Sequence, residues 1–314
     1  MRHMQLRKQE EIMAKWPADA EPLVCVRCAT YKQEKFIAEC LEGFLIQETD
    51  FPFEVIVHDD ASPDGTADII REYAAKYPKI IKPYIETENQ WSKNDGSFMR
   101  IMYSLSKRKY IAMCEGDDYW IDPHKLQTQV SFLERHPDYS MTFHDAEVKD
   151  EPGVPPMESV YSKLEDRDYS ATEIYENWVI PTASMVYRRE VIDFPIKNPQ
   201  NILNGDIFLG EKCAHMGKIR CFNKKMSVYR RQPSGCTWDE NLKKARARAL
   251  PNHIRELKAN FPKIKSKKIN VDLCRSIIHV AHIDGKKKHL KDLMQAFILS
   301  PSTFIKALSK KKFF

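Results

Sequence analysis

The chain has 314 residues, of which 42% are hydrophobic and 30% are charged, and its formal net charge is +6. This length and composition allow one large globular domain, or one domain with an appendage. No apolar run approaches the roughly 20 residues that cross a bilayer. The polar start MRHMQLRKQEE lacks the apolar centre of a signal peptide, so we expect a cytoplasmic protein.

The first half of the chain predicts alternating strands and helices. We expect strands at 22–30, 54–60, 80–86 and 109–118, with helices at 36–45, 62–77, 96–106 and 123–136 between and after them. The segment 62–77 begins with the turn residues SPDG before it becomes helical. This alternation predicts an α/β fold, with a mainly parallel, Rossmann-like sheet and helices on both faces.

Further along, the pattern is less regular. A strand is expected at 141–143, a Pro- and acid-rich loop over the site at 150–169, and a strand followed by a helix at 183–192. The segment NGDIFLGEKCAHMG predicts a loop that enters a helix, and two strands, KIRCF and MSVYR, follow it. After Trp238 the pattern is helical to the end of the chain.

Charge is distributed unevenly along the sequence. Residues 241–314 hold 19 Lys and Arg against 4 Asp and Glu, a net of +15, which leaves −9 on the first 240 residues. We therefore expect an N-terminal extension at 1–20, one α/β domain at 21–238 and a basic helical region at 239–314.

The unusual polar residues gather at the expected strand ends. Thr30 and Tyr31 follow the first strand, and Asp59 and Asp60 end the second. The fourth strand ends in the sequence EGDD. Since ligands of open parallel sheets bind outside the carboxyl ends of the strands, these side chains are expected to line one crevice.

The segment HDDASPDGT resembles the first six positions of an EF-hand calcium loop. The twelfth position, however, is Arg71 where glutamate is required, and a strand precedes the loop in place of a helix, which excludes that site. Asp64 and Gly65 suit a turn and helix cap. The adjacent Asp59 and Asp60 suit hydrogen bonding to a ligand.

The acids of EGDDYW repel one another unless a cation lies among them. Carboxylate oxygens are preferred ligands of Mg²⁺ and Mn²⁺, which complete their shells with substrate phosphates. A cap for the following helix is the alternative role for Asp118. A third acid, Asp206, precedes an expected helix; an N-cap is the ordinary role there, and a general base is the alternative.

Four segments together resemble the family 2 glycosyltransferases of GT-A fold. They are VCVRCATYKQEKFI, EVIVHDDASPDGTADII, KYIAMCEGDDYWIDPHKLQTQV and NGDIFL, and the resemblance covers about residues 21–238. It implies that Thr30 and Tyr31 line a nucleotide pocket and that Asp60, with Asp59 beside it, hydrogen-bonds the base.

The resemblance also implies a metal site and a catalytic base. Asp117 would lie near the ribose, and Asp118 would ligate Mn²⁺ or Mg²⁺ at the diphosphate of the donor. Asp117 and Glu115 are further candidate metal ligands, and Asp206 would be the catalytic base of an inverting transfer. Arg100 is a candidate to reach the donor diphosphate, as are residues 230–232; a surface or packing role is the alternative for each.

The implied activity is transfer of one sugar from a nucleotide sugar, expected to be a UDP-sugar, to a glycan or lipid-linked acceptor of a surface glycan. The QxxRW motif of processive synthases is absent. Two other functions stay open: a nucleotidyltransferase, disfavoured because CATYKQEKF has no glycine-rich phosphate loop, and a catalytically silent nucleotide-binding or membrane-docking protein.

The basic helices leave two alternatives, which are peripheral docking on an anionic membrane surface and a solvated appendage. Nucleic acid is not expected as a partner, because the acidic crevice would repel it and no nucleic-acid-binding motif is present.

Overall fold

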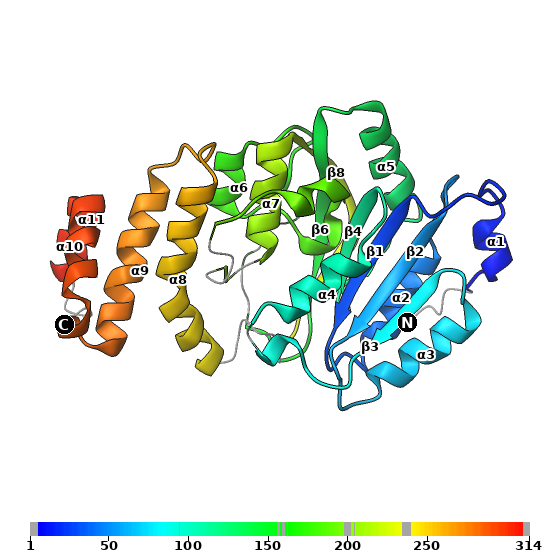
Figure 1. Cartoon of the computed structure of the whole chain (residues 1–314), viewed down its shortest axis with the longest axis horizontal. Helices are drawn as coiled ribbons and strands as arrows, with labels where there is room; N and C mark the ends of the chain where they lie inside the picture. Colours follow the sequence, from blue (N-terminus) through cyan, green and yellow to red (C-terminus); the bar gives the residue numbers. More distant parts are fainter. Residues whose placement is uncertain are drawn as a thin grey trace. The chain divides into compact units, whose positions relative to one another are not determined.

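In the computed structural model of the chain, the described residues are 6–93, 95–155, 158, 161, 163–197, 202–203, 205–233 and 240–309. They form two compact units (Figure 1). Unit 1 comprises Met1–Ser170, Val179–Phe194 and Met216–Gln232, and unit 2 comprises Ala171–Trp178, Pro195–His215 and Pro233–Phe314.

Unit 1 is built on an eight-stranded sheet of order β3-β2-β1-β4-β7-β6-β8-β5. Its strands are β1 (Val24–Thr30), β2 (Phe53–Asp59), β3 (Ile81–Ile85), β4 (Tyr110–Glu115), β5 (Tyr119–Trp120), β6 (Tyr139–Asp150), β7 (Val186–Arg188) and β8 (Lys218–Arg231). Strands β1 to β4 pair in parallel, as do β6 and β8, whereas β7 and β5 run antiparallel to their neighbours. The predicted mainly parallel sheet is confirmed.

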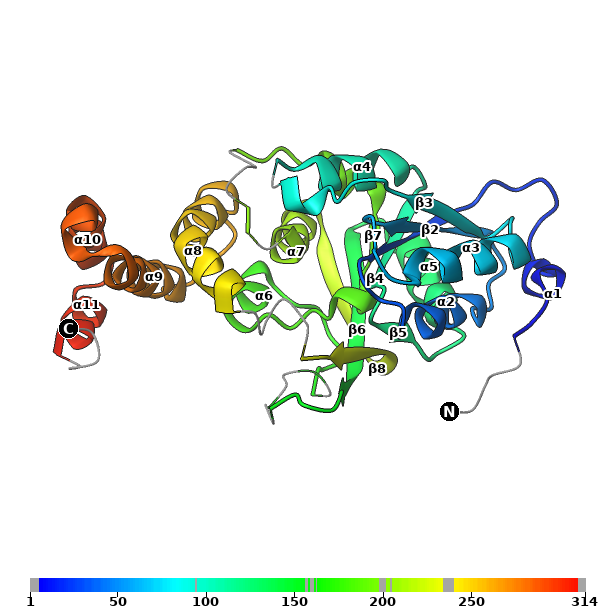
Figure 2. The ribbon, with the colours of Figure 1, turned by 90° about the horizontal axis from the view of Figure 1, so that it is seen from below.

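Helices cover both faces of this sheet (Figures 1 and 2). The α-helices of unit 1 are α1 (Gln9–Met13), α2 (Ile37–Leu45), α3 (Thr66–Lys76), α4 (Ser97–Leu105) and α5 (Lys125–Arg135). Short 3-10 helices lie at Trp91–Lys93, Thr182–Ser184 and Arg189–Asp193. Because side chains alternate along a strand, β1 supplies both faces: Cys28 packs in the cluster that contains Phe44 of α2, whereas Arg27 lies 5.5 Å from the ring of Tyr103 on α4.

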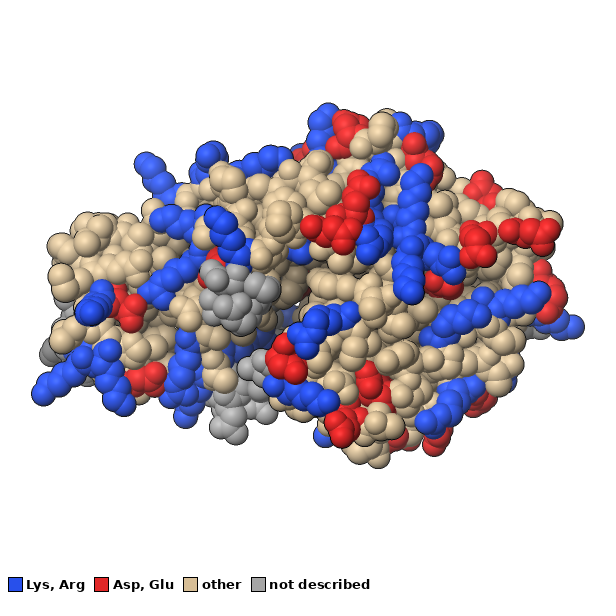
Figure 3. All heavy atoms as spheres, viewed as in Figure 1, with Lys and Arg blue, Asp and Glu red and all other residues tan. Residues whose placement is uncertain are grey.

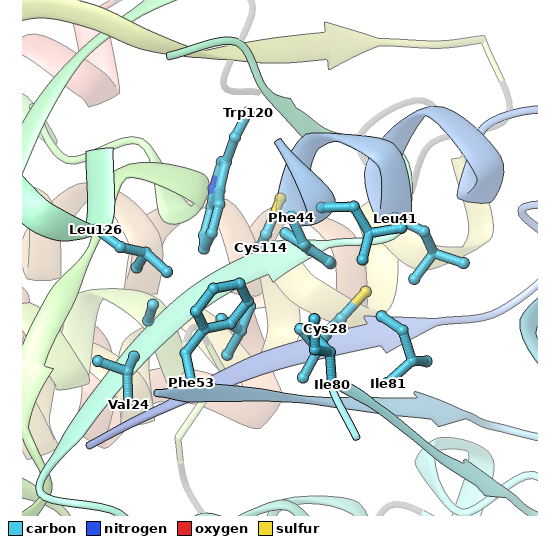
Figure 4. Packing of buried hydrophobic residues seen from close by; sticks show 14 of the residues in the cluster. Val24, Cys28, Leu41, Phe44, Phe53, Ile80, Ile81, Cys114, Trp120 and Leu126 are labelled. Carbon is cyan, nitrogen blue, oxygen red and sulfur yellow. The ribbon is translucent and has the colours of Figure 1, made fainter. Parts of the chain in front are cut away.

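A hydrophobic core cluster lies between the parallel strands and the helices α2, α3 and α5 (Figure 4). Phe44 and Trp120 meet edge to face, with ring centroids 4.7 Å apart. The N-terminal segment joins this core, because Ile12 of α1 is 3% exposed within it and Trp16 Nε1 donates a hydrogen bond to Thr49. The segment from Leu6 to Trp16 is therefore packed against the domain that was expected to begin at residue 21.

Two strands differ from their predicted extent. The strand expected at 141–143 is β6, which runs for twelve residues to Asp150. The two strands expected at KIRCF and MSVYR form the single strand β8, whose pairing with β6 shifts register between His144 and Ala146. The intervening polar residues interrupt the hydrophobic pattern, but backbone hydrogen bonds to β6 continue the strand beyond them.

Unit 2 is helical in the residues that the structure describes. It contains α6 (Ala171–Asn177), α7 (Gly205–Met216) except for its last residue, α8 (Glu240–Asn260), α9 (Lys268–Asp284), α10 (Leu290–Leu299) and α11 (Pro301–Ser309), with a 3-10 helix at Lys286–His289. Phe208 of α7 packs against His253 and Phe261, with ring centroids 5.2 Å apart in both pairs. The helix that begins at Gly205 therefore groups with the C-terminal helices, although the sequence analysis placed it in the domain at 21–238. The boundary expected at 238/239 lies outside the described residues.

Candidate active site

The three strands whose ends carry the predicted site residues are neighbours in the sheet. Strand β1 lies between β2 and β4, and all three run in the same direction. The pairing sets Thr30 opposite Asp59 and Ala29 opposite Glu115. The residues that follow, Asp60 and the segment 116–118, therefore leave the sheet at one common edge.

Asp59 and Asp60 are both buried, and their carboxylates accept hydrogen bonds from the chain itself. Asp59 Oδ2 accepts from the backbone amide of Ser62 at 3.0 Å, and Asp59 Oδ1 accepts from the hydroxyl of Ser62 at 2.5 Å. Asp60 Oδ1 accepts from the amide of Gln90 at 2.7 Å, and its Oδ2 from the amide of Trp91 at 3.0 Å. The two acids thus shape the turn after β2 and hold the segment at residues 90–91 against it.

Thr30 packs directly against the loop that follows β4. Its Oγ1 is buried and finds no hydrogen-bond partner among the described residues. A Cβ at Gly116 would lie 2.7 Å from that oxygen and 2.8 Å from Thr30 Cβ, which is too close for any side chain. Only glycine lets this loop, residues 115–118 and called the acidic loop below, approach Thr30 this closely. Tyr31, the next residue, is 41% exposed.

The acidic loop turns sharply between Glu115 and Asp118. The amide of Asp118 donates to the carbonyl of Glu115 at 3.0 Å, and the amide of Gly116 donates to the carbonyl of Ala29 at 2.9 Å. Glu115 is exposed and Asp118 is 2% exposed. Burial, then repulsion from Asp117 and Glu115, raises the pKa of Asp118 well above its usual range. Burial also raises the pKa of Asp117.

Arg230, in β8, fastens this loop from the other side. Its backbone amide donates to Asp118 Oδ1 at 2.8 Å, and its Nε donates to the backbone carbonyl of Asp117 at 2.8 Å. Its guanidinium also pairs with Glu151 at 2.9 Å and with Glu39. Gln232 Nε2 donates to Asp117 Oδ2 at 2.8 Å. The Arg230 side chain is thus engaged with groups of the protein, which is the packing alternative left open for it above.

The residues present fit a divalent cation that is completed by its substrate. The described ranges contain no group of three or more His, Cys, Asp or Glu side chains that could hold a metal ion. Mg²⁺ and Mn²⁺ commonly bind through one or two carboxylates plus substrate phosphates. Asp118 suits that role, because its Oδ1 is fixed by the Arg230 amide while its Oδ2 accepts no hydrogen bond from any described residue. A buried carboxylate with one unpaired oxygen is costly unless a cation compensates it.

Arg100 has a different environment from the acidic loop. Its side chain is 66% exposed on α4, and its contacts in the described structure are with Asp95, whose carbonyl it approaches at 2.8 Å. Nothing in this geometry directs it to the acids at the strand ends.

Asp206 lies in the first turn of α7, in unit 2. Its Oδ1 accepts a hydrogen bond from the amide of Ile207 at 2.9 Å, and its Oδ2 has no described partner. Burial raises the pKa of Asp206, and Arg246 of α8 opposes that effect. A partly buried carboxylate with a raised pKa and an uncommitted oxygen is suited to accept a proton.

Sequence reasoning did not single out His253, which supports the chain just before Asp206. His253 is 1% exposed in α8, and its Nδ1 accepts a hydrogen bond from the backbone amide of Leu203 at 3.3 Å. Burial lowers the pKa of His253 to about 4, so the ring is neutral and Nδ1 can accept. No local pattern marks this contact, because 50 residues separate its partners.

Two relatives show how the sequence compares with known proteins. The chain is 40% identical over 207 residues to the uncharacterized protein Rv1520 of Mycobacterium tuberculosis (strain H37Rv), covering 66% of this chain and 58% of that protein. It is 31% identical over 112 residues to the Escherichia coli UDP-Glc:alpha-D-GlcNAc-diphosphoundecaprenol beta-1,3-glucosyltransferase WfaP, covering 36% of this chain and 41% of that enzyme. The chain thus spans somewhat over half the length of its mycobacterial relative.

Solved structures share the fold. Staphylococcus aureus TarS 1–349 in complex with UDP-GlcNAc gives a TM-score of 0.59 at 17% identity, over 87% of this chain and 79% of that one. The mannosyltransferase PcManGT of Pyrobaculum calidifontis, in complex with GDP-Man and Mn²⁺, gives a TM-score of 0.55 at 17% identity, over 94% of this chain and 91% of that one. These likenesses establish the GT-A fold.

The region that matches a known family includes the strand ends that carry Asp59, Asp60 and the acidic loop. Residues 25–194, more than half of the chain, match the family described as Glycosyl transferase family 2. That region contains β2 to β4, all of β1 except its first residue and the whole acidic loop, and it ends before Asp206. This chain therefore belongs to glycosyltransferase family 2.

Proposed function

We propose that the protein transfers one sugar from a nucleotide diphosphate sugar to a hydroxyl group of a glycan or lipid-linked acceptor, with inversion at the anomeric carbon. The observation that carries the proposal is the convergence of the buried Asp118 and its neighbours at the common edge of β1, β2 and β4. Family membership supports it, as do the fold neighbours bound to UDP-GlcNAc and to GDP-Man with Mn²⁺.

The nucleotide is assigned to the carboxyl ends of β1 and β2. Thr30 offers a hydroxyl without a partner in the described structure, and the ring of Tyr31 is exposed beside it. Asp59 and Asp60 keep the turn after β2 in place. Their carboxylates retain lone pairs that can accept hydrogen bonds from the nucleotide base, since each carboxylate oxygen accepts several hydrogen bonds. Arg100 is left out of this assignment because its contacts are with Asp95.

Asp118 is assigned as the carboxylate that holds Mn²⁺ or Mg²⁺, with Asp117 beside it and Glu115 as an outer acid. A bound cation would supply charge neutralisation for the departing diphosphate. The Arg230 amide fixes the orientation of Asp118, and Gln232 fixes that of Asp117. Two positioned carboxylates avoid the reorganisation that flexible side chains would need during the reaction.

Asp206 is assigned as the general base. Its carboxylate would accept the proton of the acceptor hydroxyl as that oxygen attacks the anomeric carbon. One displacement of the nucleotide diphosphate then inverts the configuration. Burial raises the pKa of Asp206, which brings its basicity closer to what proton abstraction requires.

A thermal-shift screen tests the proposal. UDP-glucose, UDP-galactose, UDP-N-acetylglucosamine and GDP-mannose are each added with and without Mn²⁺. We expect one donor to raise Tm by several degrees when Mn²⁺ is present, and little change when it is absent. Slow release of the nucleotide diphosphate from that donor then separates an enzyme from a silent binding protein. Equal stabilisation without metal would refute the role of Asp118, and no stabilisation by any nucleotide sugar would refute the proposal.

A further inference from the structure

Helix α10 exposes a continuous apolar surface. Leu290 is 61% exposed, Met294 68%, Phe297 46% and Ile298 76%. Their spacing of i, i+4, i+7 and i+8 places all four on one side of the helix. Large apolar side chains exposed singly are ordinary, but a contiguous group marks an interaction surface.

Helix α11 packs against α10 and carries a further exposed apolar residue. Phe304 of α11 meets Phe297 of α10 with ring centroids 5.6 Å apart, which joins the two helices, and Ile305 is 57% exposed. We call the group Leu290, Met294, Phe297, Ile298 and Ile305 the apolar face.

The other side of α10 is fixed within unit 2. Ala296 is fully buried, and Arg255 of α8 donates to Asp292 at 2.8 Å and to Gln295 at 2.7 Å. These contacts hold the orientation of the helix, so the apolar face is presented by a packed helix.

Lysines are the main charged residues of the segment that carries the apolar face. The segment 285–309 contains five lysines and a single acid, Asp292, which is paired with Arg255. The lysines are Lys286, Lys287, Lys288, Lys291 and Lys306, all exposed. Figure 3 shows Lys and Arg side chains predominating over the C-terminal helices, with uncharged surface between them.

The dimensions suit a helix that lies along a membrane surface. Ten residues of α-helix extend about 15 Å, half of the roughly 30 Å hydrocarbon core. Among the described residues, no helix combines the length and hydropathy needed to cross a membrane. An exposed apolar face in a lysine-rich helical segment is the pattern of interfacial helices, whose apolar side chains enter the acyl boundary while their lysines meet anionic headgroups.

We propose that the apolar face docks this protein on an anionic lipid surface. A second copy of the chain suits the face less well, because a two-fold contact would bring the same lysines together from both copies. Docking is independent of the proposed sugar transfer, although it would bring the protein to the membrane plane where lipid-linked acceptors lie.

Vesicle sedimentation of the full chain tests the proposal. We expect binding to phosphatidylcholine vesicles that contain 30% phosphatidylglycerol, little binding to pure phosphatidylcholine, and release as salt is raised. The double variant Met294→Gln/Ile298→Gln should weaken partitioning at least tenfold, and Lys287→Gln/Lys291→Gln should weaken it severalfold.

Matched controls keep the result interpretable. Met216→Gln removes an apolar side chain that is 42% exposed outside the face, and Lys79→Gln/Lys107→Gln removes two exposed charges elsewhere; both should bind vesicles like wild type. Equal Tm values for all variants exclude misfolding as the cause. If the apolar variant binds vesicles as wild type does, the proposal fails. It also fails if light scattering shows a wild-type dimer that the variant dissociates, with no vesicle binding by either. Since no donor is present, a failed sugar-transfer assay does not affect this test.

Discussion

The backbone amide of Arg230 donates a hydrogen bond of 2.8 Å to Asp118 Oδ1 across 112 residues of sequence. The donor is main chain, so the strand β8 itself, and not a replaceable side chain, sets the direction of the carboxylate. The guanidinium of the same residue is held by Glu39, Glu151 and the carbonyl of Asp117. One residue of β8 therefore fastens the acidic loop through both its backbone and its side chain.

Asp118→Asn separates stability from function. The amide keeps an oxygen for the Arg230 hydrogen bond but removes a buried negative charge, so Tm of the metal-free protein should stay equal or rise. Release of nucleotide diphosphate in the presence of Mn²⁺ should fall by roughly a hundredfold or more. Asp68→Asn, which replaces an exposed carboxylate of α3, is the control and should alter neither Tm nor the release of nucleotide diphosphate. Wild-type turnover in Asp118→Asn would remove the metal role from this residue.

Gly116→Ala should displace the acidic loop. The added methyl group would lie 2.7 Å from Thr30 Oγ1, and overpacking of this kind costs about 1–3 kcal/mol. We expect a lower Tm and weaker donor binding in the thermal-shift assay. Gly205→Ala is the matched control: nothing lies within 4 Å of its Cβ position, and alanine favours a helix. Equal Tm and donor affinity in both variants would show that the close approach to Thr30 has no consequence.

Asp206→Asn should strongly reduce transfer to an acceptor while leaving donor binding intact. The amide cannot take the hydroxyl proton, and the residue belongs to a different unit from the acidic loop. Isothermal titration with the donor and Mn²⁺ should give a dissociation constant within about threefold of wild type, and transfer should drop by about two to four orders of magnitude. A large loss of donor affinity would indicate a nucleotide-binding role instead.

His253 is expected to act as a positioning residue for Asp206. His253→Leu removes the acceptor for the Leu203 amide, so kcat should fall while the KM for the donor changes little. His253→Asn places an amide oxygen near the position of Nδ1 and should restore much of kcat. If both variants lose activity only in proportion to their loss of folded protein, as followed by circular dichroism, the residue is structural alone.

Glu211 should make the stability of unit 2 depend on pH. It is fully buried in α7, its carboxylate accepts no hydrogen bond from the described residues, and burial raises its pKa to about 8. Between its usual value of 4.5 and about 8, the folded protein keeps a proton that the unfolded chain has lost. Stability therefore falls as pH rises through that range, by on the order of 5 kcal/mol in total.

Glu211→Gln carries no titrating proton, so its Tm should decline less than that of wild type between pH 5 and pH 9. The exposed Glu190→Gln is the control and should follow wild type. Parallel Tm curves for wild type and Glu211→Gln would show that the carboxylate gains a compensating partner.

The amino-acid sequence determined the parts of this protein that local patterns encode. Alternating apolar strands and amphipathic helices fix the mainly parallel sheet, and a strand that ends in Asp59 or Glu115 must bring those acids to its carboxyl end. Neighbouring parallel strands then share that edge, so the position of the acids in the sheet could be predicted before any contact was known.

The tertiary structure alone decided which groups those acids meet. Asp60 accepts hydrogen bonds from the amides of residues 90 and 91, and Asp118 accepts one from the amide of Arg230. The chain just before Asp206 is held by the hydrogen bond from the Leu203 amide to His253. Each of these contacts joins segments 30 to 112 residues apart. Local periodicity specifies which face of an element is buried, but not which distant segment packs against it; that depends on how all the elements fill the core together.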